Sequence, residues 1–182
     1  MWQYNCLDET QLRLLEKGIV DLSGEVDGDM AQYVREAIIR LITKDSPEIK
    51  ILITSSGGAV DIGLDIYDAL HAYQGRKTGI VYGYARSMAA VILQACDERQ
   101  CACHAHIMIH HIYHKNVSLD ILRSAKKLKE IKSEMEESQN KIYRILSKRS
   151  GKNENEIREK CVKEQEMSSE KALEFGLIDK II

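Results

Sequence analysis

The chain has 182 residues, and 26 Lys and Arg against 28 Asp and Glu give a formal net charge of −2. This length fits one domain with a sizeable core, and the mixed, near-neutral charge lacks the basic surface of a nucleic-acid-binding protein. No run reaches the roughly 20 apolar residues that a membrane helix needs, and residues 1–9 lack the basic-then-apolar pattern of a signal peptide. We therefore expect a cytoplasmic protein with no membrane association.

Strand and helix patterns alternate in the first half of the chain. Three apolar, β-branched runs predict strands, at residues 18–22, 49–54 and 80–82. Three segments with apolar residues at helical spacing predict helices, at residues 30–43, 59–73 and about 87–96. Gly57 and Gly58 predict a tight turn between the second strand and its helix. This alternation is typical of an α/β fold with a parallel sheet and crossover helices.

One long amphipathic segment, residues 119–149, dominates the second half. Ser118 is a candidate N-cap and Gly151 follows a basic last turn. A continuous helix of this length would extend for roughly 45 Å. It could be a bent surface helix, but its apolar stripe runs the whole length, which favours packing against another subunit. A short helix at 169–175, Gly176 and a closing strand at 177–182 complete the prediction.

Two glycine-containing segments that follow predicted strands are candidates for chemistry. In Ser55-Ser-Gly-Gly58, adjacent glycines can expose backbone N–H groups that would stabilise an oxyanion. No Lys-Ser/Thr follows, so this segment is not a P-loop. In Gly83-Tyr-Ala-Arg-Ser87-Met-Ala-Ala90, Ser87 opens a predicted helix, either as an N-cap or as a nucleophile. A nucleophilic serine needs a neighbouring base.

His110 is the candidate for that base, although a single histidine at the end of a strand is more often structural. His110 ends the apolar run Ile107-Met-Ile-His110 and comes after the Gly-Gly segment and Ser87. These segments resemble the corresponding motifs of the ClpP serine-peptidase family, as do Asp65-Ile-Tyr-Asp68 and the closing Ala172-Leu-Glu-Phe-Gly-Leu-Ile-Asp179. The resemblance extends from about residue 14 to residue 182. Each motif is weak alone, and their order and spacing make the set specific.

The resemblance implies roles for six residues of the site. Ser87 would attack the scissile carbonyl and His110 would take its proton. The backbone N–H groups of Gly58 and Met88 would form the oxyanion hole. An extended peptide would pair with Ala59 and Val60 as an added strand. No cofactor and no metal are implied.

The resemblance also implies an architecture and partners. It predicts one peptidase domain over residues 1–182, with a crotonase-like spiral of repeated ββα units. The head would comprise about 14–116 and 152–182, and a protruding handle helix would comprise about 118–151. Such chains form homo-oligomers of stacked rings that degrade peptides or unfolded proteins. An AAA+ unfoldase docks on axial loops in this family, but the segment before residue 14 is short, so we expect weak or absent docking.

The acidic member of the triad is the main departure from the family. Alignment through Ser150-Gly151 and Ala172 places Lys160 where the family has aspartate. Lysine cannot accept the imidazole N–H. A local shift could bring in another carboxylate, for which Glu164 is the first candidate, followed by Glu159 and Glu166. A Ser-His dyad, a Ser-Lys dyad with Lys160, and a weak or inactive paralogue that scaffolds an active partner are the alternatives.

Three further interpretations follow from the residues. Arg86 stands where the family has a small residue, and we expect it to narrow the pocket or bind an acidic side chain. A crotonase-like acyl-CoA enzyme is a rival on the same fold, but it has no need of the Ser87 and His110 order. The ligand-rich run Cys101-Ala-Cys103-His104-Ala-His106 would place cysteines and histidines on opposite faces of a strand, which disfavours a tetrahedral metal site.

Overall fold

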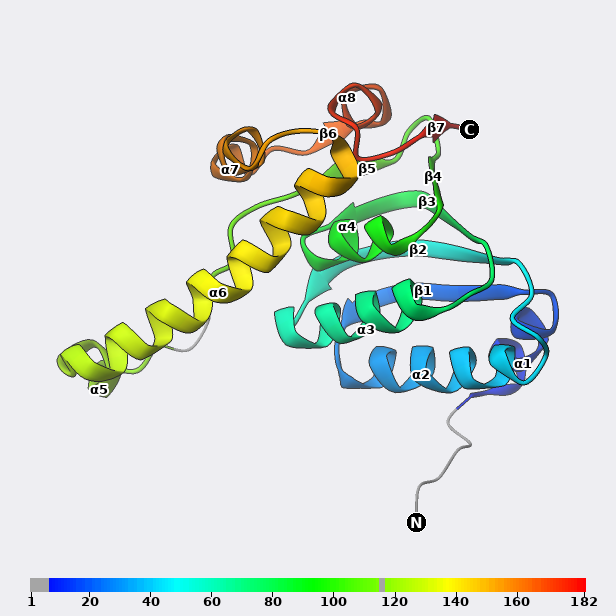
Figure 1. Ribbon diagram of the computed structural model, residues 1–182, viewed down its shortest axis with the longest axis horizontal. Helices are drawn as coiled ribbons and strands as arrows, with labels where there is room; N and C mark the ends of the chain where they lie inside the picture. The colour runs from blue at the N-terminus through cyan, green and yellow to red at the C-terminus, as the bar shows by residue number, and fades with distance from the viewer. Residues whose placement is uncertain (1–6, 115–116) are drawn as a thin grey trace, which may run out of the picture.

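The computed structural model describes residues 7–114 and 117–182. A mostly parallel sheet lies at its centre, with β1, β2, β3, β4 and β7 side by side in that order (Figure 1). Their bounds are Ile19–Val26, Ile49–Gly58, Lys77–Arg86, Glu98–Cys101 and Lys180–Ile181. The α/β fold predicted from the alternation of strand and helix patterns is therefore confirmed.

β3 changes its neighbour halfway along its length. Its first half, Thr78–Val81, pairs with β4, whereas Tyr84–Arg86 pairs with β5 (His106–Met108). The outer edge of β5 pairs antiparallel with β6 (Met167–Ser168). A segment from late in the sequence is thereby brought next to the carboxyl end of β3.

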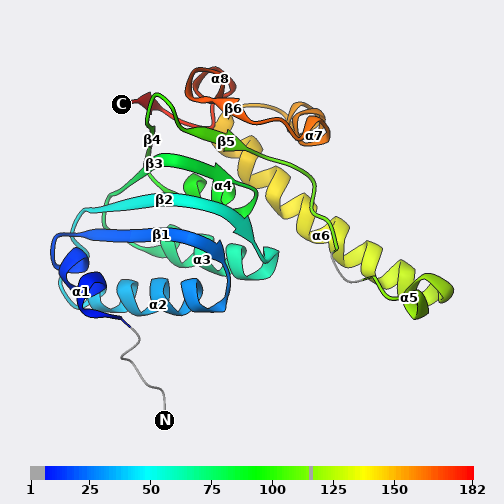
Figure 2. The same ribbon diagram turned by 180° about the vertical axis from the view of Figure 1, so that it is seen from behind.

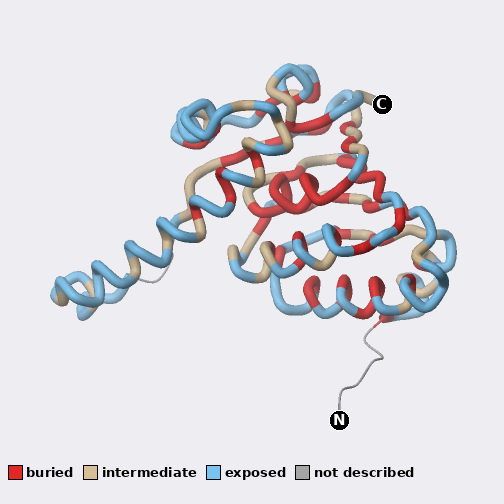
Figure 3. The backbone as a smooth tube through the Cα atoms, viewed as in Figure 1, coloured by how far each residue is buried: buried red, intermediate tan, exposed pale blue. Residues whose placement is uncertain are grey.

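Helices cover one face of this sheet, and the two opposite views agree on this arrangement (Figures 1 and 2). They are α2 (Gly28–Ile42), α3 (Val60–Ala72) and α4 (Met88–Ile92), while α1 (Glu9–Glu16) lies at the end of the sheet. A 3-10 turn, Leu93–Ala95, follows α4. The central strands and the inner faces of these helices form one hydrophobic core, and its buried residues are red in Figure 3.

The later helices lie at the other end of the molecule. α5 (Leu119–Arg123) and α6 (Ala125–Ser150) extend away from the sheet, and α7 (Glu154–Lys163) and α8 (Ser169–Phe175) return to it (Figure 1). α6 is largely exposed in its first half, and its buried residues lie in its second half (Figure 3). These are Gln139, Ile142, Tyr143 and Leu146.

The prediction of one continuous helix from 119 to 149 was wrong. Ser124 has extended backbone angles, φ −106° and ψ 105°, and separates α5 from α6. Its side-chain oxygen accepts a hydrogen bond from the Lys127 N–H, so Ser124, rather than Ser118, supplies the side-chain cap of the long helix. Serine competes with helical hydrogen bonding in this way. Gly151 ends α6 in the left-handed conformation, as the sequence indicates.

The prediction of a tight turn at Gly57 and Gly58 was also wrong. β2 continues through both glycines because Glu25 and Val26 of β1 pair with them. The first and third strands are likewise longer than predicted, since β1 extends to Val26 and β3 to Arg86. The closing strand is shorter than predicted, and the sequence patterns missed α1, α7 and β4. α8 has the predicted bounds. None of the helices in the described part of the chain is long and apolar enough to cross a membrane.

A buried arginine attaches the end of the chain to the sheet. Arg99 on β4 is only 3% exposed, and its Nε donates to Asp179 Oδ2 at 2.9 Å. Its Nη1 also donates to the Gly176 carbonyl and to Gln94. Burial opposes the charged form of Asp179, but hydrogen bonds from Arg99 outweigh it, so the pKa of this carboxyl lies below its usual 3.8.

Replacing Asp179 with Asn should lower the free energy of unfolding by about 2 kcal/mol at pH 7, because Arg99 would keep a buried charge without its counter-ion. A carboxyl with a depressed folded-state pKa stabilises the fold above its unfolded pKa. This stabilisation disappears as the pH falls through the folded-state value. Denaturant unfolding should therefore show that the difference in free energy of unfolding between the wild type and Asp179→Asn shrinks below about pH 3.8. Asp120→Asn, on the exposed helix α5, is the matched control, and equal stability of both variants at pH 7 would contradict the account.

Candidate active site

The nucleophile candidate lies in a strained turn between β3 and α4. Ser87 has φ 53° and ψ −125°, although it carries a side chain, and such backbone strain is concentrated at functional sites. Its N–H donates to the Met108 carbonyl at 2.8 Å. The Ser87 side chain makes no capping hydrogen bond to α4. Ser87 is therefore the N-cap residue of α4 by position only, since its side chain does not cap the helix.

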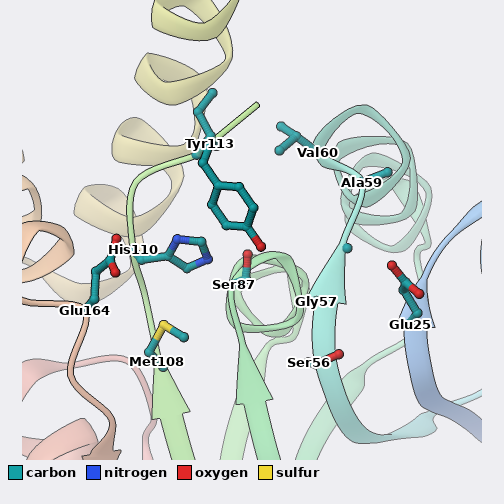
Figure 4. A pocket seen from close by; sticks show the side chains of 12 residues that line it. Glu25, Ser56, Gly57, Ala59, Val60, Ser87, Met108, His110, Tyr113 and Glu164 are labelled. Carbon is teal, nitrogen blue, oxygen red and sulfur yellow. The ribbon is translucent and has the colours of Figure 1, made fainter. Parts of the chain in front are cut away.

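Ser87 and His110 line the same pocket. The pocket has a volume of about 580 Å³. Twelve residues line it: Glu25, Ser56, Gly57, Gly58, Ala59, Val60, Ser87, Met108, His110, Ile112, Tyr113 and Glu164. Figure 4 shows the His110 ring beside the Ser87 side chain, with Tyr113 next to both. Five of the expected site residues, Ser87, His110, Gly58, Ala59 and Val60, are thus brought together around one cavity.

The backbone of Gly57 lies close to Ser87 and to the Met88 nitrogen. Gly57 has φ +86°, and a Cβ placed on it would lie 2.6 Å from Ser87 Cβ and 2.9 Å from the Met88 nitrogen. Its own N–H donates to Ser55 Oγ. The Ala59 N–H donates to Val26 on β1 at 2.9 Å. Because successive N–H groups of an extended strand point in opposite directions, the Gly58 N–H faces away from β1, on the side of β3.

Of the three carboxylates considered for the triad, Glu164 is the one that lines the pocket. It ends α7 in the left-handed conformation, φ 45° and ψ 32°, and its side chain is directed toward His110 (Figure 4). Within the described residues, no hydrogen bond joins the Glu164 and His110 side chains. Glu159 is exposed on α7 and is not among the residues that line the pocket.

Arg86 and Lys160 both have partners away from the pocket. The Arg86 guanidinium forms an ion pair with Glu166 and lies over the Tyr84 ring, 4.3 Å from its centroid. Arg86 does bind an acidic side chain, but it does not line the pocket that we expected it to narrow. Lys160 Nζ lies 5.6 Å from the centroid of the Phe175 ring and is likewise absent from the pocket lining.

The sequence patterns did not identify Glu25, Ile112 and Tyr113 as pocket residues. Glu25 reaches the pocket because β1 is longer than predicted and pairs with Gly57. Tyr113 is 64% exposed, and its ring centroid lies 5.5 Å from that of His110. Its position three residues after His110, beyond the strand, was the signal that could have identified it.

The cysteines are dispersed and mostly buried. Cys101 ends β4, and the chain turns before β5, so the run 101–106 is not the single strand that we expected.

Burial raises the pKa of Cys96 and Cys161 to about 12 and that of Cys101 to about 11, which suppresses their thiolate forms. Cys103 is exposed, and Cys6 lies outside the described residues. In the described ranges, no three His, Cys, Asp or Glu side chains are grouped as metal ligands would be.

The chain also matches the model of a known protein family. The family model described as Clp protease matches residues 3–182, which is nearly the whole chain. The match includes the segments that carry Ser87, His110 and the two glycines of β2.

Gly57→Ala should lower any hydrolytic turnover by about 100-fold, because the added methyl would displace Ser87 or the Met88 backbone. The left-handed φ adds strain, which should lower the free energy of unfolding by about 1 to 3 kcal/mol. Gly28→Ala is the matched control, since nothing lies within 4 Å of its new Cβ and no positive φ is involved. Turnover of Gly57→Ala equal to that of Gly28→Ala would show that this close approach is not required.

Proposed function

The chain belongs to the Clp protease family, and we propose that it is a serine endopeptidase that hydrolyses peptide bonds of unfolded or short peptides. The observation that carries this proposal is the conformation of Ser87. A non-glycine residue at φ 53° presents its hydroxyl to a pocket that it shares with His110. The closely packed glycine backbone of β2 lies on the opposite side of Ser87.

The first half of the reaction forms an acyl-enzyme. His110 accepts the Ser87 hydroxyl proton as Oγ bonds to the scissile carbonyl carbon, whose oxygen becomes an oxyanion. The N–H groups of Gly58 and Met88 would stabilise that oxyanion, and the close approach of Gly57 to Ser87 and to the Met88 nitrogen supports this assignment. His110 then protonates the leaving amine, the peptide C–N bond breaks, and the new amino terminus departs.

The second half regenerates the enzyme. Water loses a proton to His110 and attacks the acyl carbon, and Ser87 recovers the proton as the ester bond breaks. Ala59 and Val60 line the pocket directly after β2 ends, and we propose that they contact the substrate. Because Val60 is the first residue of α3, an extended peptide would pair with the backbone before it and not with Val60 itself. Both partial reactions use only groups of this chain and one water molecule.

Glu164 is our candidate for the third member of the triad. It lines the pocket, and a carboxylate near His110 stabilises the imidazolium that forms when Ser87 attacks. Lys160 points to Phe175, which does not support a Ser-Lys dyad. Glu166 has Arg86 as its partner, and Glu159 lies outside the pocket.

At the level of architecture, we propose a single peptidase domain over residues 1–182 with a crotonase-like spiral. The head comprises about 14–116 and 152–182, and the handle comprises about 118–151. Apolar side chains near the tip of the handle, such as Leu119, Leu122 and Leu128, are 44–58% exposed. This exposure supports the proposal that the handle packs against another subunit in stacked homo-oligomeric rings. A cytoplasmic location and weak docking of an AAA+ unfoldase remain predictions.

A second function is favoured by one specific observation. Lys160 occupies the position at which the family resemblance places the triad aspartate. Glu164 lines the same pocket as His110, but no hydrogen bond joins their side chains within the described residues. A Clp-family subunit with this arrangement could scaffold or regulate an active partner instead of cutting peptides. The reactivity of Ser87 distinguishes the two functions.

A fluorophosphonate probe should label the wild-type protein on Ser87, because attack on phosphorus needs the same activated hydroxyl and oxyanion donors as attack on a carbonyl. Mass spectrometry of the labelled peptide identifies the site. Ser87→Ala should abolish both labelling and peptide hydrolysis, whereas Ser56→Ala, at the other side of the same pocket, should retain labelling. No labelling of the correctly assembled wild-type protein would support the scaffold.

Glu164→Ala should lower kcat for a fluorogenic peptide by about 10- to 100-fold, since His110 loses the carboxylate that stabilises its charged form. KM should change little, because the proposed substrate contacts, Ala59 and Val60, are not altered. Glu159→Ala is the matched control on the same helix and should leave kcat unchanged. If both glutamate variants turn over like the wild type, the enzyme operates as a Ser-His dyad.

A further inference from the structure

The segment that presents Glu164 is a three-residue connection between two anchored elements. On one side, α7 is fixed by Ile157 and Cys161, both completely buried. On the other side, Met167 begins β6, is completely buried and pairs with Ile107 of β5. Residues 164–166 between these anchors are all exposed. Their path therefore depends on the few contacts that they make themselves.

The connection begins in a conformation that glutamate does not prefer. Glu164 has φ 45°, and its N–H donates to the Cys161 carbonyl at 3.3 Å, which is long for such a bond. A left-handed residue with a side chain persists only where its surroundings determine the conformation. A further contact is therefore needed to hold the Glu164 side chain on the pocket side.

Arg86 supplies that contact. Its guanidinium donates to the Glu166 carboxylate, two residues beyond Glu164. The same guanidinium lies over the Tyr84 ring, 4.3 Å from the centroid, which restricts its orientation. Arg86 is also fixed through its backbone, since it pairs with Met108 of β5. Arg86 is therefore held by its side chain and by its backbone directly before the nucleophile.

The ion pair thus connects two halves of the candidate triad. Arg86 is adjacent in sequence to Ser87, and Glu166 is in the same short connection as Glu164. Ser87 itself is held to β5 by its N–H bond to Met108, and β5 leads to His110. The nucleophile, the base and the carboxylate are therefore joined through β3, β5 and this one ion pair.

We propose that Arg86 and Glu166 are positioning residues, whose ion pair holds the α7–β6 connection so that Glu164 faces His110. This inference rests on the proposed function of Ser87, His110 and Glu164. It explains two differences from the family pattern together. These are Arg86 before Ser87, and a carboxylate at position 164 where lysine stands at position 160. A partly exposed ion pair adds little to stability, so its effect should be seen in turnover.

The test is a set of variants in the full-length protein, assayed with a fluorogenic peptide. Arg86→Ala and Glu166→Ala should each lower kcat by about tenfold with KM within about twofold, and the double variant should be no worse than either, because they remove one interaction. In a Glu164→Ala background, Arg86→Ala should cause no further loss. Arg86→Lys should recover part of the turnover, and the charge swap R86E/E166R should recover more than either half alone.

The control is a more exposed ion pair between two elements away from the pocket. Arg35 on α2 binds Asp65 on α3 at 2.7 Å, with both side chains more than half exposed. Arg35→Ala should leave kcat unchanged. Melting temperatures should be similar for Arg35→Ala and Arg86→Ala, so a fall in turnover of the latter would not reflect unfolding.

The outcomes separate this inference from the proposed function. The positioning inference is wrong if the wild type is active and Arg86→Ala has the same kcat. It is also wrong if Arg86→Ala lowers kcat by the same factor in the Glu164→Ala background. In both cases the proposed peptidase function stands. If the wild type neither labels with fluorophosphonate nor cuts peptides, the proposed function fails. Crystal structures of the wild type and of Arg86→Ala then decide the inference, which requires Glu164 to leave the pocket in the variant.

Discussion

The structure depends on the close approach of two backbones at the carboxyl end of β3. Gly57 leaves no room for a side chain between itself and Ser87, and this contact occurs where β3 turns sharply into α4. The Ser87 N–H is fixed on its other side by Met108 of β5. A positive φ at a non-glycine residue is costly and is tolerated only where neighbouring strands impose it. The position of Ser87 in the pocket lining is a consequence of this geometry.

Parallel pairing then determines which other groups reach the serine. β3 exchanges β4 for β5 halfway along, so the chain after β5 carries His110 past the strained turn. β6 pairs with the outer edge of β5 and brings the α7–β6 connection, with Glu164, to the same place. Residues from four separate parts of the sequence meet because strand ends of a parallel sheet lie at one edge.

The sequence was informative where local chemistry determines the outcome. The α/β alternation, Gly151 and α8 were predicted correctly because helical spacing and caps act over a few residues. The break at Ser124 was missed because a capping serine within a long amphipathic pattern does not differ from a surface serine. Glu25 and Tyr113 could not be assigned to the pocket because strand register and loop path are tertiary properties. Likewise, only the fold shows that Arg86 binds Glu166, 80 residues away.

The central claim is that Ser87 attacks a carbonyl whose oxyanion is stabilised by backbone donors of β2 and α4. The most direct measurement is a crystal structure of the protein reacted with a peptide boronate, whose tetrahedral adduct resembles the intermediate. We predict a bond from boron to Ser87 Oγ, with one boronate oxygen within hydrogen-bonding distance of the Gly58 and Met88 nitrogens and the peptide in contact with Ala59 and Val60. A boronate bound elsewhere, or an oxygen directed away from both nitrogens, would contradict the account.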